Sequence, residues 1–561
     1  MYGKEQIEFL KNKNYLLADE TIEQRINDIV EVVRSYEVRY SEGLADRIHD
    51  LITRQVFSLS TPQWANMNRP KKGNTTPLPV SCNIINYPDS IAGIYYAHGE
   101  AAMLSKLGAG VGASFLNISN KGTLVNEGIF TNPKLNWIED FVGTTQKVSQ
   151  QGVRRGYGAP FISIDDPEFY DLMERIAKTN PNKHDPLVDN NVGVVLPLGF
   201  RDRIKEGDEE ARKRFLTVLQ ERQDTGKLYI LDVENMNKNH SPVYEKLGHI
   251  VDSSNICLEA NTPSYDDKTF ACVLSSLNLV HWDEIRENPQ IIKDAIMFLD
   301  IVVEEYIRLT EGIPFLDKVR KSSIEKRDIG LGTLGFAEYL QMNNASYGDI
   351  KSRMLNRQIY STIRKYAEET TKEMAEKLGS PKMCQDAGMV RRNVSLLMVA
   401  PNKSTSFICG NTTPGIEPNR SNVFVKALAG IQTVVKNKYL EQLLEKKGKN
   451  EQEVWESIID NLGSVAHLDF LTQDEKNVFR TASEISPKDM IDLAADRQEY
   501  IDMAQSLNLF NRPNYTLKDV YDIHMYGLNK GIKTFYYFFP QVHAAYEKDG
   551  EKWDSCISCA D

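Results

Sequence analysis

The sequence is poor in cysteine and lacks long apolar runs. Its 561 residues include seven cysteines, an odd number and too few for a disulfide-stabilised scaffold of this length. No stretch of about 18 apolar residues occurs, so we expect no membrane-spanning segment. Residues 1–20 also lack the apolar core of a signal peptide. We therefore expect a cytoplasmic protein whose cysteines are buried, metal-bound or chemically active.

Acidic residues outnumber basic ones, by 78 to 67. The formal net charge is −11 and the pI is near 5.5, which argues against a broad surface for nucleic acid or for an anionic membrane. A single phosphorylated ligand remains compatible with this charge, because it needs only a few local donors. The hydrophobic fraction of 41% is typical of a globular chain with a large core.

Strand-like and helix-like patterns alternate along the chain. Apolar residues on one face of Thr21–Val38 predict a helix in an N-terminal helical region. Further on, short apolar runs predict buried strands and longer amphipathic segments predict helices, which indicates an α/β architecture with parallel strands. The predicted strands are 192–198, 227–233, 395–400 and 534–539, and the predicted helices include 291–309 and 352–378, the second ending at Gly379.

Two glycine-rich motifs carry little functional information by themselves. GLGTLG (Gly330–Gly335) fits the G-x-G-x-x-G pattern of dinucleotide-binding folds, but a charged segment precedes it and no βαβ unit frames it. A nucleotide-dependent dehydrogenase is therefore a minor alternative. GAGVGAS (Gly108–Ser114) lets the backbone approach another group closely, and a tight loop is the default expectation.

Three polar residues alternate in the segment Ser253–Ala260, namely Asn255, Cys257 and Glu259. In an extended segment they would point to one side and bring an amide, a thiol and a carboxylate together. A nearby carboxylate disfavours a thiolate, so the arrangement suits a hydrogen-atom donor better than a nucleophile. Taken alone, the motif is more typical of a buried structural cysteine than of a reactive one.

The order of motifs over most of the chain resembles that of ribonucleotide reductase catalytic subunits. The resemblance implies a ten-stranded α/β barrel, with Cys257 on a finger loop through its centre and a smaller helical domain before it. We therefore expect an N-terminal helical region (1–57), a catalytic barrel (58–547) and a mobile C-terminal redox tail (548–561). The segments that carry the resemblance are STPQWAN (Ser60–Asn66), VSCNIINYPDS (Val80–Ser90), QQGVRRGYGA (Gln150–Ala159), ERQDTGKLYILDVENMNKNHSP (Glu221–Pro242), NICLE (Asn255–Glu259), FACVLSSLNL (Phe270–Leu279), RRNVSLLMVAPNKSTSFICGNTTPGIEP (Arg391–Pro418), GIKTFYY (Gly531–Tyr537) and CISC (Cys556–Cys559).

The resemblance also implies a role for each catalytic residue. Cys257 would hold a transient thiyl radical that abstracts the 3′-hydrogen of the substrate, Glu259 would be the base on the 3′-hydroxyl, and Asn255 would hydrogen-bond the ribose. Cys82 and Cys272 would be the reducing pair. The terminal Cys556 and Cys559 would re-reduce that pair by thiol–disulfide exchange; the alternative is half of a zinc site, but no second C-x-x-C completes it.

Binding sites follow from the same resemblance. The substrate would be a ribonucleoside di- or triphosphate, held by a phosphate loop that follows a predicted strand. NTTPG (Asn411–Gly415), close to this loop, departs from the family pattern by one extra residue. Cys409 matches no role in the family, and Cys384 is expected to be inert. The deoxynucleotide effector would lie at two loops, Gly108–Gly122 and Gln150–Gly158. Because the chain starts close to the catalytic region, we expect neither the N-terminal ATP cone of the family nor the activity switch that it provides. The expected substrate-binding residues are Thr61, Ser81, Asn402, Lys403, Ser404, Thr405 and Ser406, and the expected allosteric residues are Asp89, Asn117 and Arg154.

Tyr536 and Tyr537 resemble the tyrosine pair through which class I enzymes receive a radical from a metal-containing small subunit. Without that context they would be two strand aromatics facing opposite ways. We therefore expect a class I enzyme with no cofactor bound in this chain, a radical-generating small (beta) subunit, thioredoxin or glutaredoxin as reductant, and a homodimer. The alternative is a class II enzyme, in which adenosylcobalamin forms the radical directly; a non-catalytic regulatory paralogue is a remote one.

Overall fold

A curled sheet of seven strands lies at the centre of the protein. The computed structural model describes residues 2–70, 76–126, 129–150, 156–177, 180, 182, 185–188, 190–428 and 431–539. Within them the strand order is β11-β2-β3-β6-β7-β8-β17, with five parallel central strands and an antiparallel strand at each edge. The strands are β11 (Phe270–Cys272), β2 (Cys82–Asn86), β3 (Gly110–Ser114), β6 (Gly158–Ser163), β7 (Gly193–Leu196), β8 (Tyr229–Asp232) and β17 (Thr534–Phe535).

A second sheet, β1-β12-β13, allows the first to close into a barrel. One end is joined by the chain itself, because β11 continues into β12 after a single residue. At the other end the Tyr536 N–H donates to the Leu507 carbonyl at 3.0 Å, and parallel bridges join Gln505 to Val399 and Leu397 to β13. The α/β barrel expected from the resemblance is therefore present, and the two sheets of seven and three strands together hold ten strands. The strands of the second sheet are β1 (Phe57–Leu59), β12 (Leu274–Asn278) and β13 (Gly330–Leu334).

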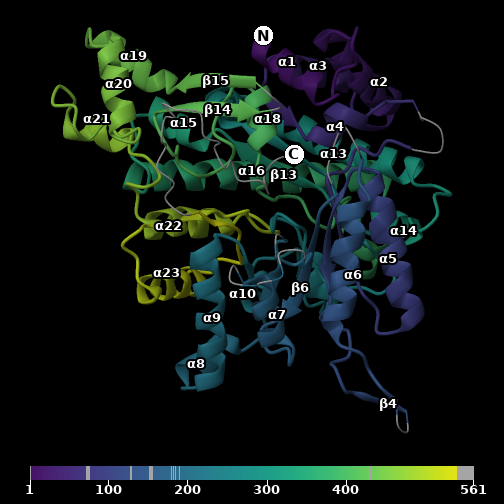
Figure 1. Ribbon diagram of the computed structural model, residues 1–561. Coiled ribbons are helices and arrows are strands. Elements are labelled where there is room, and N and C mark those ends of the chain that lie inside the picture. The colour runs from purple at the N-terminus through teal and green to yellow at the C-terminus, as the bar shows by residue number, and fades with distance from the viewer. Residues whose placement is uncertain are drawn as a thin grey trace.

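Helices cover the outside of the barrel (Figure 1). The three N-terminal helices gather at one end, while α5 and α6 lie side by side along one flank. Capping explains where some helices begin: Thr21 and Gln24 exchange side-chain and backbone hydrogen bonds at the start of α2. The long helix α16 ends where Gly379 takes a φ of 86°. The covering helices include α1 (Lys4–Asn12), α2 (Ile22–Tyr40), α3 (Leu44–Thr53), α5 (Ile91–Lys106), α6 (Lys134–Lys147), α9 (Glu209–Thr225), α13 (Gln290–Leu309), α14 (Asp317–Lys326), α16 (Ile350–Leu378), α22 (Pro487–Gln498) and α23 (Leu517–Asn529).

The predicted elements are largely present. The runs 192–198 and 227–233 contain β7 and β8, and the two long predicted helices are α13 and α16. The run 395–400 makes only isolated bridges. The run 534–539 is not one strand, because it divides into β17 and the two-residue strand β18 (Phe538–Phe539), which pairs with β16 (Leu509–Phe510).

The motif GLGTLG forms the buried strand β13 rather than a phosphate-binding loop. A Cβ at Gly330 would lie 2.0 Å from the Met398 Cε, and a Cβ at Gly332 would lie 2.6 Å from the Met398 carbonyl oxygen. The glycines therefore serve close packing inside the barrel, which agrees with rejecting a dinucleotide site.

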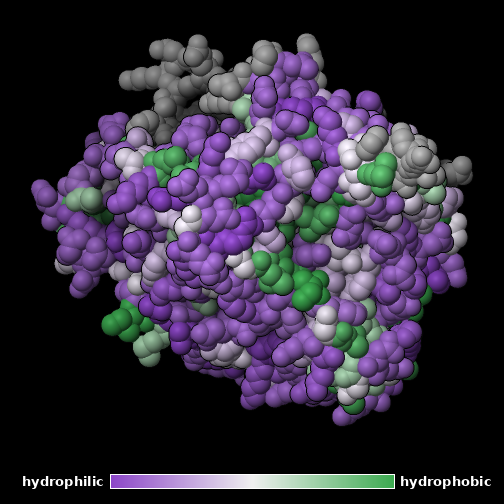
Figure 2. Space-filling model, turned by 90° about the horizontal axis from the view of Figure 1, so that it is seen from below, coloured by the Kyte–Doolittle hydropathy of each residue, from purple (hydrophilic) through white to green (hydrophobic). Residues whose placement is uncertain are grey.

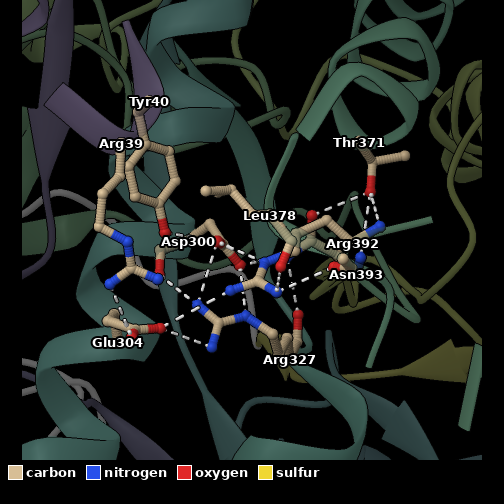
Figure 3. A network of polar contacts seen from close by, with 10 residues as sticks. Arg39, Tyr40, Asp300, Glu304, Arg327, Thr371, Leu378, Arg392 and Asn393 are labelled. Atoms are coloured by element: carbon tan, nitrogen blue, oxygen red, sulfur yellow. Dashed lines mark hydrogen bonds and ion pairs between the residues drawn. The ribbon is translucent and has the colours of Figure 1, made fainter. Parts of the chain in front are cut away.

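A buried ionic network joins the N-terminal helices to the barrel (Figure 3). The Asp300 carboxylate on α13 accepts hydrogen bonds from Arg327 at 2.9 and 3.0 Å, Arg392 at 3.2 Å, Tyr40 at 2.7 Å and Asn393 at 2.8 Å. Burial alone would raise the pKa of Asp300, but Arg327 and Arg392 lower it to about 2. Because Tyr40 ends α2 and Arg327 directly precedes the β13 region, the network fixes α2 against the barrel.

A smaller apolar cluster lies beside the barrel at α19 (Lys438–Lys446), α20 (Gln452–Asp460) and α21 (Gln473–Val478). The hairpin of β14 (Val423–Leu428) and β15 (Ile431–Lys436) leads into it (Figure 1). The face seen from below is mostly hydrophilic, with apolar residues in small areas (Figure 2). Among the helices that the structure describes, none is both long and apolar enough to cross a membrane.

Candidate active site

A short hairpin inside the barrel carries the central cysteine. Its strands β9 (Ser253–Ser254) and β10 (Asn261–Thr262) pair antiparallel, and residues 255–260 form its tip. A Cβ at Gly110 of β3 would lie 2.3 Å from the Ile256 Cδ1, and a Cβ at Gly112 would lie 2.3 Å from the Ser254 carbonyl oxygen. GAGVGAS therefore permits the predicted close approach, but the expected tight loop is wrong, because Gly110–Ser114 is a buried strand.

The tip itself is a turn and not the extended segment that we expected. The Asn255 N–H donates to the Ala260 carbonyl at 3.2 Å, and the Ala260 N–H donates to the Asn255 Oδ1 at 3.1 Å. Leu258 lies between the thiol and the carboxylate with a φ of 67°, a conformation that is strained for a residue with a branched side chain. The Thr534 hydroxyl donates to its carbonyl at 3.1 Å and helps to hold it there. The three polar side chains converge because the tip folds back on itself.

Glu259 is buried, and its hydrogen-bond partners among the described residues are all neutral. Its carboxylate accepts from the Asn255 amide at 2.8 Å and from the Ser506 hydroxyl at 3.1 Å. Burial raises the pKa of Glu259 to about 7, although these hydrogen bonds oppose the change. A carboxylate with this pKa exchanges a proton readily near neutral pH, as a general base must.

The Cys257 thiol lies next to Cys82 and Tyr536, each close enough to share a hydrogen bond with it. The contact with Cys82 raises the pKa of Cys257 most, followed by burial and by the Glu259 carboxylate, so that it lies well above its ordinary value. The thiol is therefore protonated at physiological pH. This is the state from which a hydrogen atom can be removed, and it is unfavourable for an ordinary cysteine nucleophile.

Cys82 and Cys272 lie directly opposite each other on β2 and β11. Opposed residues on antiparallel strands have Cα atoms about 4.5–5.5 Å apart and side chains on one face, which is within the span of a disulfide. The Cys272 Sγ also lies 3.9 Å from the Glu259 Oε1 and 3.7 Å from the Met398 sulfur. The structure thus brings together all five residues that the sequence predicts to be catalytic, and it adds Met398, which no motif indicated.

Tyr536 and Tyr537 lie between β17 and β18, and both are buried. Their ring centroids are 4.3 Å apart at an interplanar angle of 55°, so they pack on each other instead of facing opposite ways. Two residues that sequence reasoning missed complete this cluster. The Tyr537 hydroxyl accepts hydrogen bonds from the Asn191 amide at 2.7 Å and from the Tyr229 hydroxyl at 3.0 Å.

The predicted phosphate loop leads into the six-residue helix α18 (Lys403–Ile408). Asn402 is fixed by the Ser276 hydroxyl at 3.3 Å and by its own bond to the Ala400 carbonyl at 3.0 Å. Lys403 and Ser404 at the start of the helix are partly exposed.

Of the other predicted substrate residues, three are more enclosed. The hydroxyls of Thr405 and Ser406 turn inward, to the Asn402 Oδ1 at 3.0 Å and to the Lys403 carbonyl at 3.1 Å. Thr61 begins α4 (Thr61–Asn66) and is partly exposed, whereas Ser81 is buried just before β2. Lys403, Ser404 and Thr61 are therefore the accessible members of the predicted set.

Asp89 and Asn117 lie on loops at the ends of β2 and β3. The Asp89 carboxylate accepts from both the backbone N–H and the hydroxyl of Ser119, the first at 3.0 Å. The Asn117 amide donates to the Asn86 Oδ1 at 3.4 Å. Arg154, Cys556 and Cys559, which the sequence also predicts to be functional, lie outside the described residues.

Cys384 and Cys409 are both buried, and burial raises the pKa of each thiol to about 12. Such thiols are unreactive. Across the part of the chain that the structure describes, no group of three or more histidine, cysteine or acidic residues is placed to hold a metal ion.

Comparison with known proteins assigns the chain to a family. The family model described as ribonucleotide reductase, barrel domain, matches residues 80–211, 201–388 and 382–538. The ribonucleoside-diphosphate reductase large subunit of Invertebrate iridescent virus 3 is 29% identical over 569 residues, with 89% of this chain and 88% of the relative covered. A putative large subunit from Frog virus 3 (isolate Goorha) is 28% identical over 549 residues, covering 93% and 94%.

A solved structure agrees with these sequence matches. The class Id ribonucleotide reductase alpha subunit of Actinobacillus ureae superposes with a TM-score of 0.87 at 33% identity, over 96% of this chain and 97% of that one. Because the family model spans most of the chain, the chain belongs to the ribonucleotide reductase family, with the α/β barrel and the large-subunit function that the order of its motifs predicts.

Proposed function

We propose that this chain is the catalytic large subunit of a class I enzyme that reduces ribonucleoside diphosphates to deoxyribonucleotides. The observation that carries the proposal is the convergence of a protonated thiol, a carboxylate with a pKa near 7 and a facing cysteine pair inside the barrel. The names of the relatives support a diphosphate as substrate.

In this proposal Cys257, as a thiyl radical, removes the 3′-hydrogen of the ribose. Glu259 takes the proton of the 3′-hydroxyl, and Asn255, which hydrogen-bonds Glu259 at 2.8 Å, orients the ribose. Cys82 and Cys272 supply two electrons and two protons and become a disulfide, while the 2′-hydroxyl leaves as water. Cys257 then gives the 3′-hydrogen back to the substrate. This step restores the Cys257 radical, which can pass back to the small subunit.

The resulting disulfide must be reduced after each turnover. Cys556 and Cys559 would reduce it by thiol–disulfide exchange and would in turn be reduced by thioredoxin or glutaredoxin. Serine at both positions should abolish turnover with thioredoxin but preserve it with a small dithiol. Equal loss with both reductants would contradict this role.

The radical would enter from the small subunit through Tyr537 and Tyr536, with no cofactor bound in this chain. Supporting this route, the Tyr536 hydroxyl lies beside the Cys257 thiol and the two tyrosine rings pack together. Large subunits of this family have a small-subunit partner, and the reductant, the effectors and the homodimer remain part of the proposal. Ile91 and Tyr95, exposed one helical turn apart on α5, support a second copy as a partner.

The first test is reduction of CDP and CTP with a dithiol and a deoxynucleotide effector. Activity only after the cognate small subunit is added would support the proposal, and a preference for CDP would support the diphosphate. Product with adenosylcobalamin as the only added cofactor would instead indicate class II. Turnover by Cys257→Ser would overturn the mechanism.

A further inference from the structure

The hydroxyl of Tyr537 is fixed by two buried partners. Asn191 and Tyr229 donate to it at 2.7 and 3.0 Å. Tyr537 is 2% exposed, Tyr229 1% and Asn191 0%, so bulk water does not replace either partner. The groups that orient this hydroxyl are therefore side chains of this protein and not solvent molecules.

Tyr229 packs against both members of the tyrosine pair. Its ring centroid lies 5.0 Å from that of Tyr536 and 5.5 Å from that of Tyr537. Burial, and next the neighbouring Tyr537, raise the pKa of Tyr229 well above 10.0, so its hydroxyl keeps its proton and remains a donor. With Tyr229 donating, the Asn191 amide is a second group that influences the direction of the Tyr537 proton.

Asn191 can interact with Tyr537 in two ways. In the structure its Nδ2 donates to the Tyr537 oxygen, while its buried Oδ1 has no hydrogen-bond partner among the described residues. A half-turn of the amide would let the Oδ1 accept a hydrogen bond from the Tyr537 hydroxyl. This bond would also give the buried Oδ1 a partner, and a buried acceptor without one is costly in free energy. These are two discrete states that direct the phenolic proton differently.

The same asparagine reaches the predicted effector loop. The Asn191 backbone N–H donates to the Tyr157 hydroxyl at 3.0 Å, and the adjacent Asn190 amide donates to the Gly158 carbonyl at 2.8 Å. Tyr157 and Gly158 form the end of the segment Gln150–Gly158. This end is tightly held, because a Cβ at Gly156 would lie 2.1 Å from the Thr145 carbonyl oxygen. These two hydrogen bonds therefore couple the positions of Tyr157 and Gly158 to those of Asn191 and Asn190.

We propose that Asn191 is a positioning residue that links the effector loop, through Tyr157, to the hydroxyl of Tyr537. The inference rests on the proposed function. During radical transfer Tyr537 gives an electron to the radical of the small subunit and releases its phenolic proton, and it regains both when Tyr536 is oxidised. The orientation of the Asn191 amide decides whether that proton points toward or away from the amide, and hence how readily Tyr537 is oxidised.

The test uses the full chain with its small subunit, CDP and a deoxynucleotide effector. Asn191→Ala should lower kcat about tenfold, as expected for one lost hydrogen bond at a reacting group, with the KM for CDP unchanged. The matched control is Asn422→Ala, a buried asparagine that bonds the Gly463 and Phe479 carbonyls in the cluster beside the barrel, which should stay within about twofold of the wild type in kcat. A kcat for Asn191→Ala as high as that of the control would overturn the inference.

Spectroscopy separates positioning from a general loss of structure. With 3-aminotyrosine at position 537, the trapped radical should show an exchangeable proton coupling that changes when effector binds. Tyr157→Phe, which removes one hydroxyl from a partly exposed side chain, should abolish this change and preserve the radical. An unaltered effector response in Tyr157→Phe would overturn the link. If the wild type makes no deoxycytidine product with any small subunit, the proposed function fails, whereas an active wild type with unaffected variants refutes only this inference.

Discussion

Replacing Glu259 with glutamine should make the protein more stable at alkaline pH while abolishing turnover. The carboxyl group is buried, and its hydrogen-bond partners are neutral. Burial raises its pKa from 4.5 to about 7. An acid whose pKa is higher in the folded state than in the unfolded state loses folding stability as the pH rises between those two values.

The size of the effect follows from the same two values. The interval from 4.5 to about 7 corresponds to about 3 kcal/mol, because each pKa unit is worth about 1.4 kcal/mol. The free-energy cost of ionising this buried carboxyl group is nearly absent below pH 4.5, grows up to about pH 7 and is constant above it. Glutamine keeps the shape, and its Oε1 can still accept from Asn255. Its Nε2 can donate to the Ser506 oxygen, because the Ser506 hydroxyl also donates to the Cys257 carbonyl. Glutamine carries no charge, so Glu259→Gln removes the cost of ionisation.

The measurement is urea or thermal unfolding of both proteins at pH 5 and pH 8. At pH 8 we expect the variant to be more stable by up to about 3 kcal/mol, or about 3 °C for a chain of this size, with a much smaller difference at pH 5. Glu287→Gln, at an exposed position, is the control and should show no such dependence. In the wild type, turnover should fall about tenfold per pH unit below pH 7. Equal effects of Glu259→Gln at both pH values would refute the reasoning.

Three further predictions concern packing, redox chemistry and the ionic network. Gly112→Ala should displace the hairpin that carries the reacting thiol, because the new Cβ would lie 2.3 Å from a backbone oxygen; turnover should be lost, whereas Gly143→Ala, which meets only a lysine ammonium at 3.8 Å, should remain active. Mild oxidation should link Cys82 to Cys272, and mass spectrometry of peptides from the denatured, alkylated protein should detect that disulfide; its absence would argue against the facing register. Asp300→Asn should lower the free energy of unfolding by about 3 kcal/mol, because it removes the buried carboxylate shared by two buried arginines and leaves them only Glu304, at 2.8 and 3.7 Å; a loss below 1 kcal/mol in urea unfolding would contradict this.

The meeting of the proposed catalytic cysteines inside the barrel could be predicted from the order of motifs but not from local patterns. Cys82 and Cys272 are 190 residues apart, and their facing positions depend on the pairing of β2 with β11. No periodicity within either segment carries that information, because strand pairing at such separation is decided by the whole barrel. The α/β class, in contrast, followed from alternating strand-like and helix-like runs, since that alternation reflects burial in each segment.

The convergence of Asn255 and Glu259 was predicted for the wrong structural reason. Alternation along an extended strand would place the side chains on one face, but the segment is the tip of a hairpin that is closed by a backbone bond from Asn255 to Ala260. The strained φ of Leu258 shows why local reasoning failed. A branched residue rarely takes this conformation, and only its packing inside the barrel and the bond from Thr534 hold it there.

Tyr229 and Asn191 were missed because neither stands in a distinctive spacing. Tyr229 is an aromatic residue in a buried strand, which is the most ordinary place for one. Asn191 precedes β7, where a polar residue normally ends a loop. Their importance depends on β17 pairing with β8, which brings Tyr537 to them from more than 300 residues along the chain.

The electrostatics of the site assign different roles to its thiol and its carboxyl group. Cys82, burial and Glu259 together raise the pKa of Cys257 well above its ordinary value, so the thiol keeps its hydrogen near neutral pH. Burial brings the pKa of Glu259 to about 7, so a large fraction of this group is ionised and able to take a proton. An ionised Glu259 in turn disfavours a thiolate at Cys257. In the proposed mechanism, the base therefore helps the thiol to keep its hydrogen until a radical removes it, and the electrostatics of the site favour hydrogen-atom chemistry over nucleophilic attack.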